Sequence, residues 1–119
     1  MEHKLYDLSK LQEIAQGDEA FVKDMLNTFI SNVNEDVSNI RKYQALEDWK
    51  SIAGIAHRLV SRFAYLCADG LQALSADIEN SIANKQNLLG IEEKCDKLCA
   101  ESIVLIEKLK EDLTNQFEV

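Results

Sequence analysis

Proline is absent from this 119-residue chain, and glycine occurs only four times. Both residues interrupt helices, so their scarcity favours a protein built from long helices. Long hydrophobic runs are also missing, since no stretch approaches the roughly 20 apolar residues that span a membrane. The amino-terminal segment lacks the apolar core of a signal peptide. We therefore expect a helical protein that resides in the cytoplasm.

Basic residues are the minority: 13 Lys and Arg stand against 21 Asp and Glu, for a formal net charge of −8. An acidic surface argues against nucleic acid and anionic membranes as principal partners. The length suits one domain, residues 1–119, which can bury a hydrophobic core without disulfides or metals. Acidity and solubility together favour a monomer.

Cysteine is scarce as well. Cys67, Cys95 and Cys99 form an odd number, which argues against a disulfide framework. Cys95 and Cys99 share one helix face, but no second Cys or His pair stands at a matching spacing. We therefore predict buried, unreactive thiols in a reducing compartment, and no metal or other cofactor held by the chain.

The sequence does contain a helical repeat of apolar residues, in five segments. Asp7 and Asp69 are candidate N-caps of the first and fourth segments, Asp18 opens the second, and Gly17 follows the first. A polar turn precedes the fifth segment. The segments lie at residues 7–17, 18 to about 43, 45–67, about 71–82 and about 91–113.

Each of the four longer segments has one apolar face, which must be buried against the others. Short connections make consecutive helices antiparallel. We therefore predict an all-α fold, an antiparallel up-down-up-down four-helix bundle with a short N-terminal capping helix. The expected core positions are Phe21, Met25, Phe29, Val33, Val37, Ile40, Ile52, Ile55, Ala56, Leu59, Phe63, Leu66, Leu71, Leu74, Ile78, Ile82, Ile91, Cys95, Leu98, Ser102, Leu105, Leu109 and Leu113.

One histidine lies within the third segment, in the stretch "AGIAHRLVSRFAYL". At about 100° per residue, the apolar residues of this helix point nearly opposite to His57. Ala53 and Ala64 lie on one side of His57, and Gly54 and Ser61 lie on the other. A glycine inside a helix costs about 1 kcal/mol relative to alanine. We therefore predict an exposed imidazole among small side chains, on a surface that another molecule approaches closely.

An exposed imidazole can act as a base, bind a metal or attack as a nucleophile. General-base chemistry works best in a cleft, which an exposed bundle face does not offer. A metal would need further ligands one turn away, where Ala53 and Ser61 stand. A nucleophilic triad needs an orienting acid, which the sequence alone does not locate. The role that remains is that of a nucleophile whose substrate arrives on another protein. A neutral ring nitrogen can accept a phosphoryl group from such a partner.

These residues resemble the histidine-phosphotransfer (Hpt) domain of multistep phosphorelays. The stretches "GDEAFVKDMLNTFISNV" and "DWKSIAGIAH" are similar to the family's second helix and to its approach to the histidine. The resemblance covers most of the chain up to about residue 82 and fades in the last segment. The residues in register with the family's pattern are His57, Leu59, Leu66, Ala68, Leu71, Ile78 and Glu79.

The resemblance implies that His57 accepts a phosphoryl group from the phospho-aspartate of a receiver domain and passes it to another receiver. Such receivers belong to response regulators or to a hybrid sensor kinase, and their Mg²⁺ and lysine would neutralise the charge. It also implies a carrier without its own ATP site, and the sequence has no Gly-rich nucleotide loop. The remaining surface predicted to hold the phosphoryl group or to dock receivers comprises Lys50, Gly54, Arg58, Ser61, Arg62 and Ala64.

The chain departs from the family at three positions. Val60 and Ser61 stand where the family usually has lysine and glycine, and Cys67 stands at a usual glycine. Val60 and Ser61 favour an alternative, a degenerate relative that docks receivers without carrying phosphate. An unrelated four-helix adaptor is a second alternative. A metal or cofactor bundle is a third, but it would need inward Glu and Glu-x-x-His pairs, which an outward His57 with Glu79 does not supply.

Overall fold

The computed structural model describes residues 5–116. Over this range the chain forms five helices and no strand, which confirms the predicted all-α class. No helix among these residues combines the length and the hydrophobicity that a membrane crossing requires. The helices are α1 (Ser9–Ala15), α2 (Glu19–Ala45), α3 (Trp49–Tyr65), α4 (Asp69–Ala83) and α5 (Leu88–Gln116).

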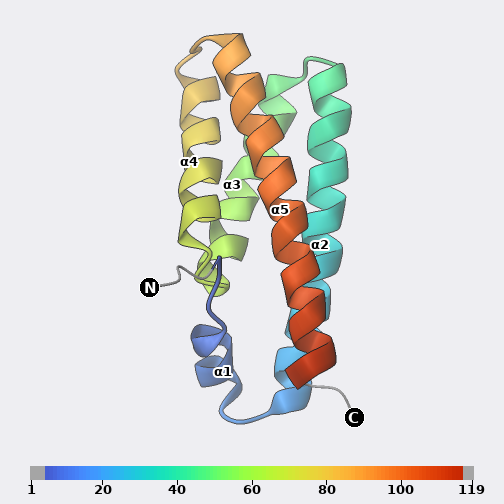
Figure 1. Cartoon of the computed structure of the whole chain (residues 1–119). Helices are drawn as coiled ribbons and strands as arrows, with labels where there is room; N and C mark the ends of the chain where they lie inside the picture. Colours follow the sequence, from blue (N-terminus) through green and yellow to red (C-terminus); the bar gives the residue numbers. More distant parts are fainter. Residues whose placement is uncertain (1–4, 117–119) are drawn as a thin grey trace.

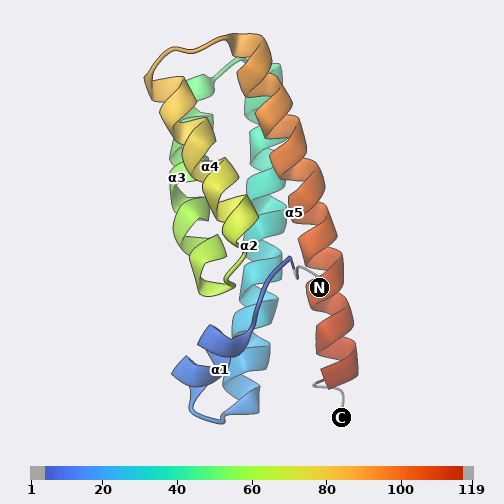
Figure 2. The same ribbon diagram turned by 60° about the vertical axis from the view of Figure 1, so that its left-hand side comes forward.

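The four longer helices form an antiparallel bundle in which each packs against two others. α3 lies between α2 and α4, and α5 closes the ring by packing against α2 and α4 (Figure 1, Figure 2). α2 and α5 have 27 and 29 residues, whereas α3 and α4 have only 17 and 15. α2 and α5 therefore extend past α3 and α4 at one end, where α1 packs against α2 (Figure 1). This is the predicted four-helix bundle with its short N-terminal capping helix.

The core fixes the orientation of α3. Burying one large aliphatic or aromatic side chain stabilises the fold by about 1.5–3 kcal/mol, so the apolar stripe of this helix is held firmly inward. The opposite stripe of α3 is consequently turned to the surface. All six core positions predicted for the third segment are buried: Ile52, Ile55, Ala56, Leu59, Phe63 and Leu66.

The apolar stripe of α2 starts one residue later than predicted. Phe21 is 39% exposed, and Met25 is only partly buried. Val22 and Leu26 take the core positions instead, because they stay in line with the buried Phe29, whereas Phe21 points about 100° away from Val22. The predictions for the first turns of α2 were therefore wrong, and those from Phe29 to the end of the stripe are confirmed.

Two of the three aspartates expected near helix starts behave differently from the prediction. Asp18 does cap α2, where its carboxylate accepts a hydrogen bond from the Phe21 N–H (3.1 Å). The cap position of α1 is Leu8 rather than Asp7, whose carboxylate accepts from the Ser9 N–H (2.8 Å). The cap position of α4 is Ala68, and Asp69 is the first helical residue. Turn geometry, which the apolar repeat does not encode, decided these boundaries.

The amino-terminal segment is tied to the ends of two long helices. The Tyr6 hydroxyl donates a hydrogen bond to the Asp112 carboxylate on α5, and burial raises the pKa of Tyr6 above its usual value. The Asp7 N–H donates to the carbonyl of Leu66, just past α3, at 2.8 Å. These contacts hold the capping helix against the end of the bundle that contains the α3–α4 turn.

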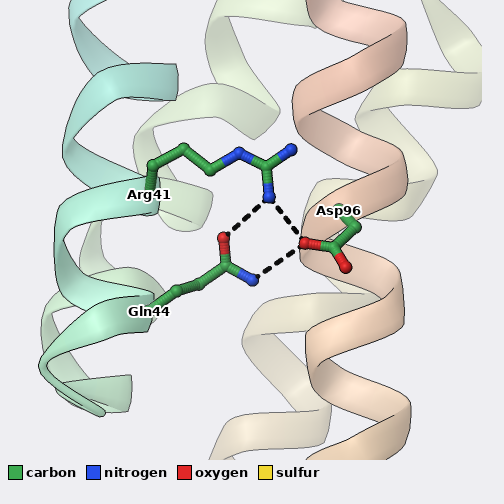
Figure 3. Close-up of polar contacts among 3 residues, drawn as sticks. All are labelled: Arg41, Gln44 and Asp96. Atoms are coloured by element: carbon green, nitrogen blue, oxygen red, sulfur yellow. Dashed lines mark hydrogen bonds and ion pairs between the residues drawn. The ribbon is translucent and has the colours of Figure 1, made fainter.

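A polar cluster joins α2 to α5 on the bundle surface (Figure 3). Arg41 Nη1 donates to Asp96 Oδ1 (2.6 Å) and to Gln44 Oε1 (3.2 Å), and Gln44 Nε2 donates to the same Asp96 oxygen (3.2 Å). The hydrogen bonds from Gln44 and Arg41 lower the pKa of Asp96. Because this cluster is exposed to solvent, it contributes at most about 1 kcal/mol and aligns the two helices rather than holding them together.

Two of the three thiols are buried as predicted, and Cys67 is not. Cys95 and Cys99 are buried on α5, and Cys67 is partly buried in the α3–α4 turn. Burial raises the pKa of Cys95 to about 12 and also raises the pKa of Cys99. A thiol that stays protonated at neutral pH is a poor nucleophile and a poor metal ligand, so Cys95 and Cys99 act as core residues.

Besides Gln16 (φ 51°) at the end of α1, the three turns that follow α2, α3 and α4 each place a non-glycine residue in the left-handed region: Glu47 (φ 55°), Cys67 (φ 52°) and Lys85 (φ 53°). Each turn closes a Schellman motif. In the first, the Glu47 N–H donates to the Gln44 carbonyl (3.1 Å) and the Asp48 N–H to the Tyr43 carbonyl (2.9 Å). Left-handed backbone costs a residue with a Cβ roughly 1–2 kcal/mol. The hydrogen bonds therefore hold these turns against local backbone strain.

Replacing Glu47→Gly is expected to raise the free energy of unfolding by about 1 kcal/mol, because glycine relieves the left-handed strain while losing some backbone entropy. Urea denaturation of the two proteins measures the difference. Glu93→Gly, at an exposed position inside α5, is the matched control and is expected to lower the free energy by about 1 kcal/mol. Equal destabilisation by both substitutions would contradict the account of the turn.

Candidate functional site

His57 lies near the middle of α3 with its ring turned away from the core. Its side chain is 73% exposed, whereas Leu59 and Phe63 on the opposite stripe are fully buried. The apolar stripe of α3 is therefore buried as predicted, and the outward orientation of the imidazole is confirmed. The ring is available to a molecule that approaches this face of α3.

Glu79 on α4 holds one nitrogen of this ring. His57 Nδ1 and Glu79 Oε2 are 2.8 Å apart. An ionised carboxylate only accepts hydrogen bonds, so Nδ1 carries the hydrogen and donates it to Glu79. The neutral ring then has its lone pair on Nε2. Among the residues that the structure describes, Glu79 is the only hydrogen-bond partner of the ring, so Nε2 is free to react.

The packing of α4 on α3 puts Glu79 in reach. Leu71 and Ile78 of α4 are buried, and Glu79 follows Ile78 at the half-buried edge of the helix. The sequence matched Glu79 to an acidic position of the family pattern but assigned it no role. This family position was the only signal in the sequence that pointed to Glu79. Glu79 lies 22 residues from His57, so helical periodicity does not relate the two residues.

Small residues surround the imidazole, as predicted. Gly54 and Ser61 are exposed, and Ala53 and Ala64 are partly buried. A Cβ built on Gly54 would meet no other atom within 4 Å. The packing of the chain therefore does not require a glycine at this position. The missing side chain lowers helix stability and leaves room for a molecule that approaches from outside.

The two arginines predicted beside the site point to a different partner. Arg62 donates a hydrogen bond to Asp36 on α2, and Arg58 Nη2 lies 3.8 Å from the other Asp36 oxygen. The Asp36 side chain is only 5% exposed. Burial raises the pKa of Asp36, and the charges of Arg62 and Arg58 oppose that shift. Reasoning from the sequence missed Asp36, although an acid beside Val37 on the apolar stripe of α2 was a visible signal.

Lys50 and Val60 complete the set of residues singled out from the sequence. Lys50 is exposed on α3, about two turns from His57 toward the N-terminus. Val60 is partly buried. Of the three cations predicted near the imidazole, Arg62 and Arg58 face Asp36, and Lys50 is exposed to solvent. None of the three lies against the ring.

The family model for the Hpt domain matches residues 24–116. The chain belongs to the Hpt domain family. No curated protein and no solved structure shows significant similarity to it. The matched segment contains His57 and excludes His3, which also lies outside the described residues. An unrelated helical adaptor with an incidental histidine is thereby ruled out.

Hpt domains are phosphocarrier modules of phosphorelays, which interact with receiver domains and have no catalytic ATP site of their own. In this Hpt domain, the histidine is exposed and its Nδ1 is held by an acid from the neighbouring helix. Val60, at the usual lysine position, brings no charge to the site. The site of this Hpt domain thus consists of an imidazole, a carboxylate and small neutral side chains.

Glu79→Ala is expected to release the ring, so that the hydrogen distributes between Nδ1 and Nε2 instead of staying on Nδ1. Long-range ¹H–¹⁵N correlation spectra of the imidazole distinguish the two tautomers. Asp69→Ala, which removes another exposed acid of α4, is the control and should leave the spectrum unchanged. A wild-type ring that already carries its hydrogen on Nε2 would contradict the assignment.

Proposed function

We propose that this Hpt domain is a transfer-competent carrier in which His57 accepts a phosphoryl group from the phospho-aspartate of one receiver domain and donates it to another. The observation that carries the proposal is the exposed ring whose Nδ1 is bound by Glu79. That arrangement leaves a nucleophilic lone pair on the nitrogen farthest from the helix. The expected setting is the cytoplasm, with the domain acting as a monomer.

The geometry supports a direct in-line exchange. The Nε2 lone pair attacks phosphorus while the bond from phosphorus to the aspartyl oxygen breaks, and the aspartate leaves as a carboxylate. The ring gains positive charge as the new bond forms, and Glu79 balances that charge through the Nδ1–H it already binds. Transfer to the second receiver reverses these steps and restores the neutral ring.

The receiver domain neutralises most of the negative charge on the transferring phosphoryl group. Phosphoryl transfer depends chiefly on positioning and electrostatics, and Mg²⁺ with lysine is the usual means of neutralising the oxygens. The resemblance to Hpt domains assigns both to the receiver. This chain needs only to present the ring and to let the receiver come close, which the small side chains at Gly54 and Ser61 allow.

A docking-only role is the second candidate, and one observation favours it. Val60 is partly buried and apolar at the position where the family usually carries a lysine. A relative that had lost phosphotransfer would tolerate that change. The intact contact between His57 and Glu79 favours the carrier, because docking alone does not require an oriented imidazole.

Incubation with a receiver domain that carries a radiolabelled phospho-aspartate tests the proposal. We expect acid-labile, base-stable label on the wild-type protein and none on His57→Gln, with unchanged helical content by circular dichroism. Several receivers are used, because the partner is not known in advance. Absence of label from the wild-type protein with all of them would support the docking-only role.

Bulky substitutions on the small-residue surface test the approach of the receiver. Gly54→Trp or Ser61→Trp is expected to slow transfer about tenfold or more. A misaligned receiver that raises the activation free energy by about 1.4 kcal/mol has that effect on the rate. Gly54→Ala should retain transfer and raise the free energy of unfolding by about 1 kcal/mol. Ala100→Trp, exposed on α5, is the control. Unchanged rates in both Gly54→Trp and Ser61→Trp would remove the steric argument.

A further inference from the structure

The cluster of Asp36, Arg58 and Arg62 carries one more positive charge than negative charge. Asp36 supplies a single carboxylate, and its side chain is 5% exposed. Two guanidinium groups, which stay protonated in proteins, face it from α3. These three groups together carry a net charge of +1, beside which Glu35 contributes a further negative charge. Arg58 directly follows His57 in the sequence.

The two arginines are held unequally. Arg62 donates a hydrogen bond to Asp36 and is 27% exposed. Arg58 Nη2 lies 3.8 Å from Asp36 Oδ1, beyond hydrogen-bond distance, and its side chain is 54% exposed. Arg58 is therefore held only by a charge interaction, without a hydrogen bond, to a carboxylate that already accepts from Arg62. Asp36 is thus satisfied by Arg62, and Arg58 can leave at little cost.

Arg58 is also the loosely held cation that neighbours the imidazole in the sequence. Adjacent helix positions point about 100° apart, so the guanidinium now lies on the α2 side and not over the ring. Its long, flexible stem allows the guanidinium to turn toward the exposed face. Lys50 is less suited, since it lies about two turns away and helical side chains lean toward the N-terminus, away from His57.

We propose that Arg58 moves from Asp36 to the phosphoryl oxygens once His57 is phosphorylated, while Arg62 stays with Asp36. This inference rests on the proposed function and names the group that compensates charge when no receiver is bound. A phosphoryl group on nitrogen carries charge close to −2, and charge-assisted hydrogen bonds from a guanidinium fit its oxygens. In the isolated carrier, Arg58 would then supply the positive charge that Val60 cannot supply.

Chemical phosphorylation tests the inference without a receiver. Phosphoramidate is the donor: its P–N bond breaks, ammonia leaves, and a bond forms from phosphorus to Nε2 of His57. The lifetime of the phosphohistidine after removal of the donor is followed by ³¹P NMR. We expect Arg58→Gln to shorten that lifetime about twofold to fivefold, the fold-change typical of one exposed charge pair. Arg58→Lys should retain part of the effect.

Arg41→Gln is the matched control, because Arg41 is similarly exposed (48%) and pairs with an acid on another helix. Its phosphohistidine lifetime should equal that of the wild type. Side-chain NMR adds a second measurement: phosphorylation should shift the Arg58 Nε–H signal and leave the Arg62 signal in place. Equal lifetimes in Arg58→Gln and wild type, or an unmoved Arg58 signal, would overturn the inference. A wild-type protein that forms no phosphohistidine would instead contradict the carrier function itself.

Discussion

The site depends on the packing of α3 against α4, because that contact alone brings His57 and Glu79 to 2.8 Å. A single hydrogen bond contributes only about 0.5–1.5 kcal/mol net, and to a charged group roughly 1.5–3 kcal/mol. The buried side chains of the two helices contribute far more in total. The core therefore sets the distance, and the hydrogen bond sets which ring nitrogen carries the hydrogen.

Each of the two helices that flank α3 supplies one carboxylate to it. On the α4 side, Glu79 accepts from the imidazole, and on the α2 side, Asp36 binds the arginines. Burial raises the pKa of Asp36 despite both guanidiniums, so the ion pair is not a strong source of stability. The ion pair instead keeps the two guanidinium groups at Asp36 and away from the ring in the unphosphorylated protein. The lone pair on Nε2 of His57 therefore remains uncovered.

Helical periodicity was sufficient to predict the bundle, the buried stripe of α3 and the outward ring of His57, since all three depend on residues within a few turns of one another. The prediction for the first turns of α2 chose a stripe one residue out of line with Phe29, and the caps of α1 and α4 were wrong because turn geometry decides them. Helical periodicity could not predict the partners of His57 and Arg62, which lie 22 and 26 residues away in the sequence. A helical wheel gives the direction of a side chain, and only the packed bundle shows what that side chain meets.

We infer that Glu79 binds Nδ1 of His57 and thereby directs phosphorylation to Nε2. The nitrogen that bears phosphorus can be identified directly by ³¹P–¹H and ¹H–¹⁵N correlation spectra of the phosphorylated, ¹⁵N-labelled protein. A single phosphohistidine is expected at residue 57, with phosphorus on Nε2 and a hydrogen on Nδ1. Phosphorus on Nδ1, or an equal mixture of the two isomers, would contradict this inference.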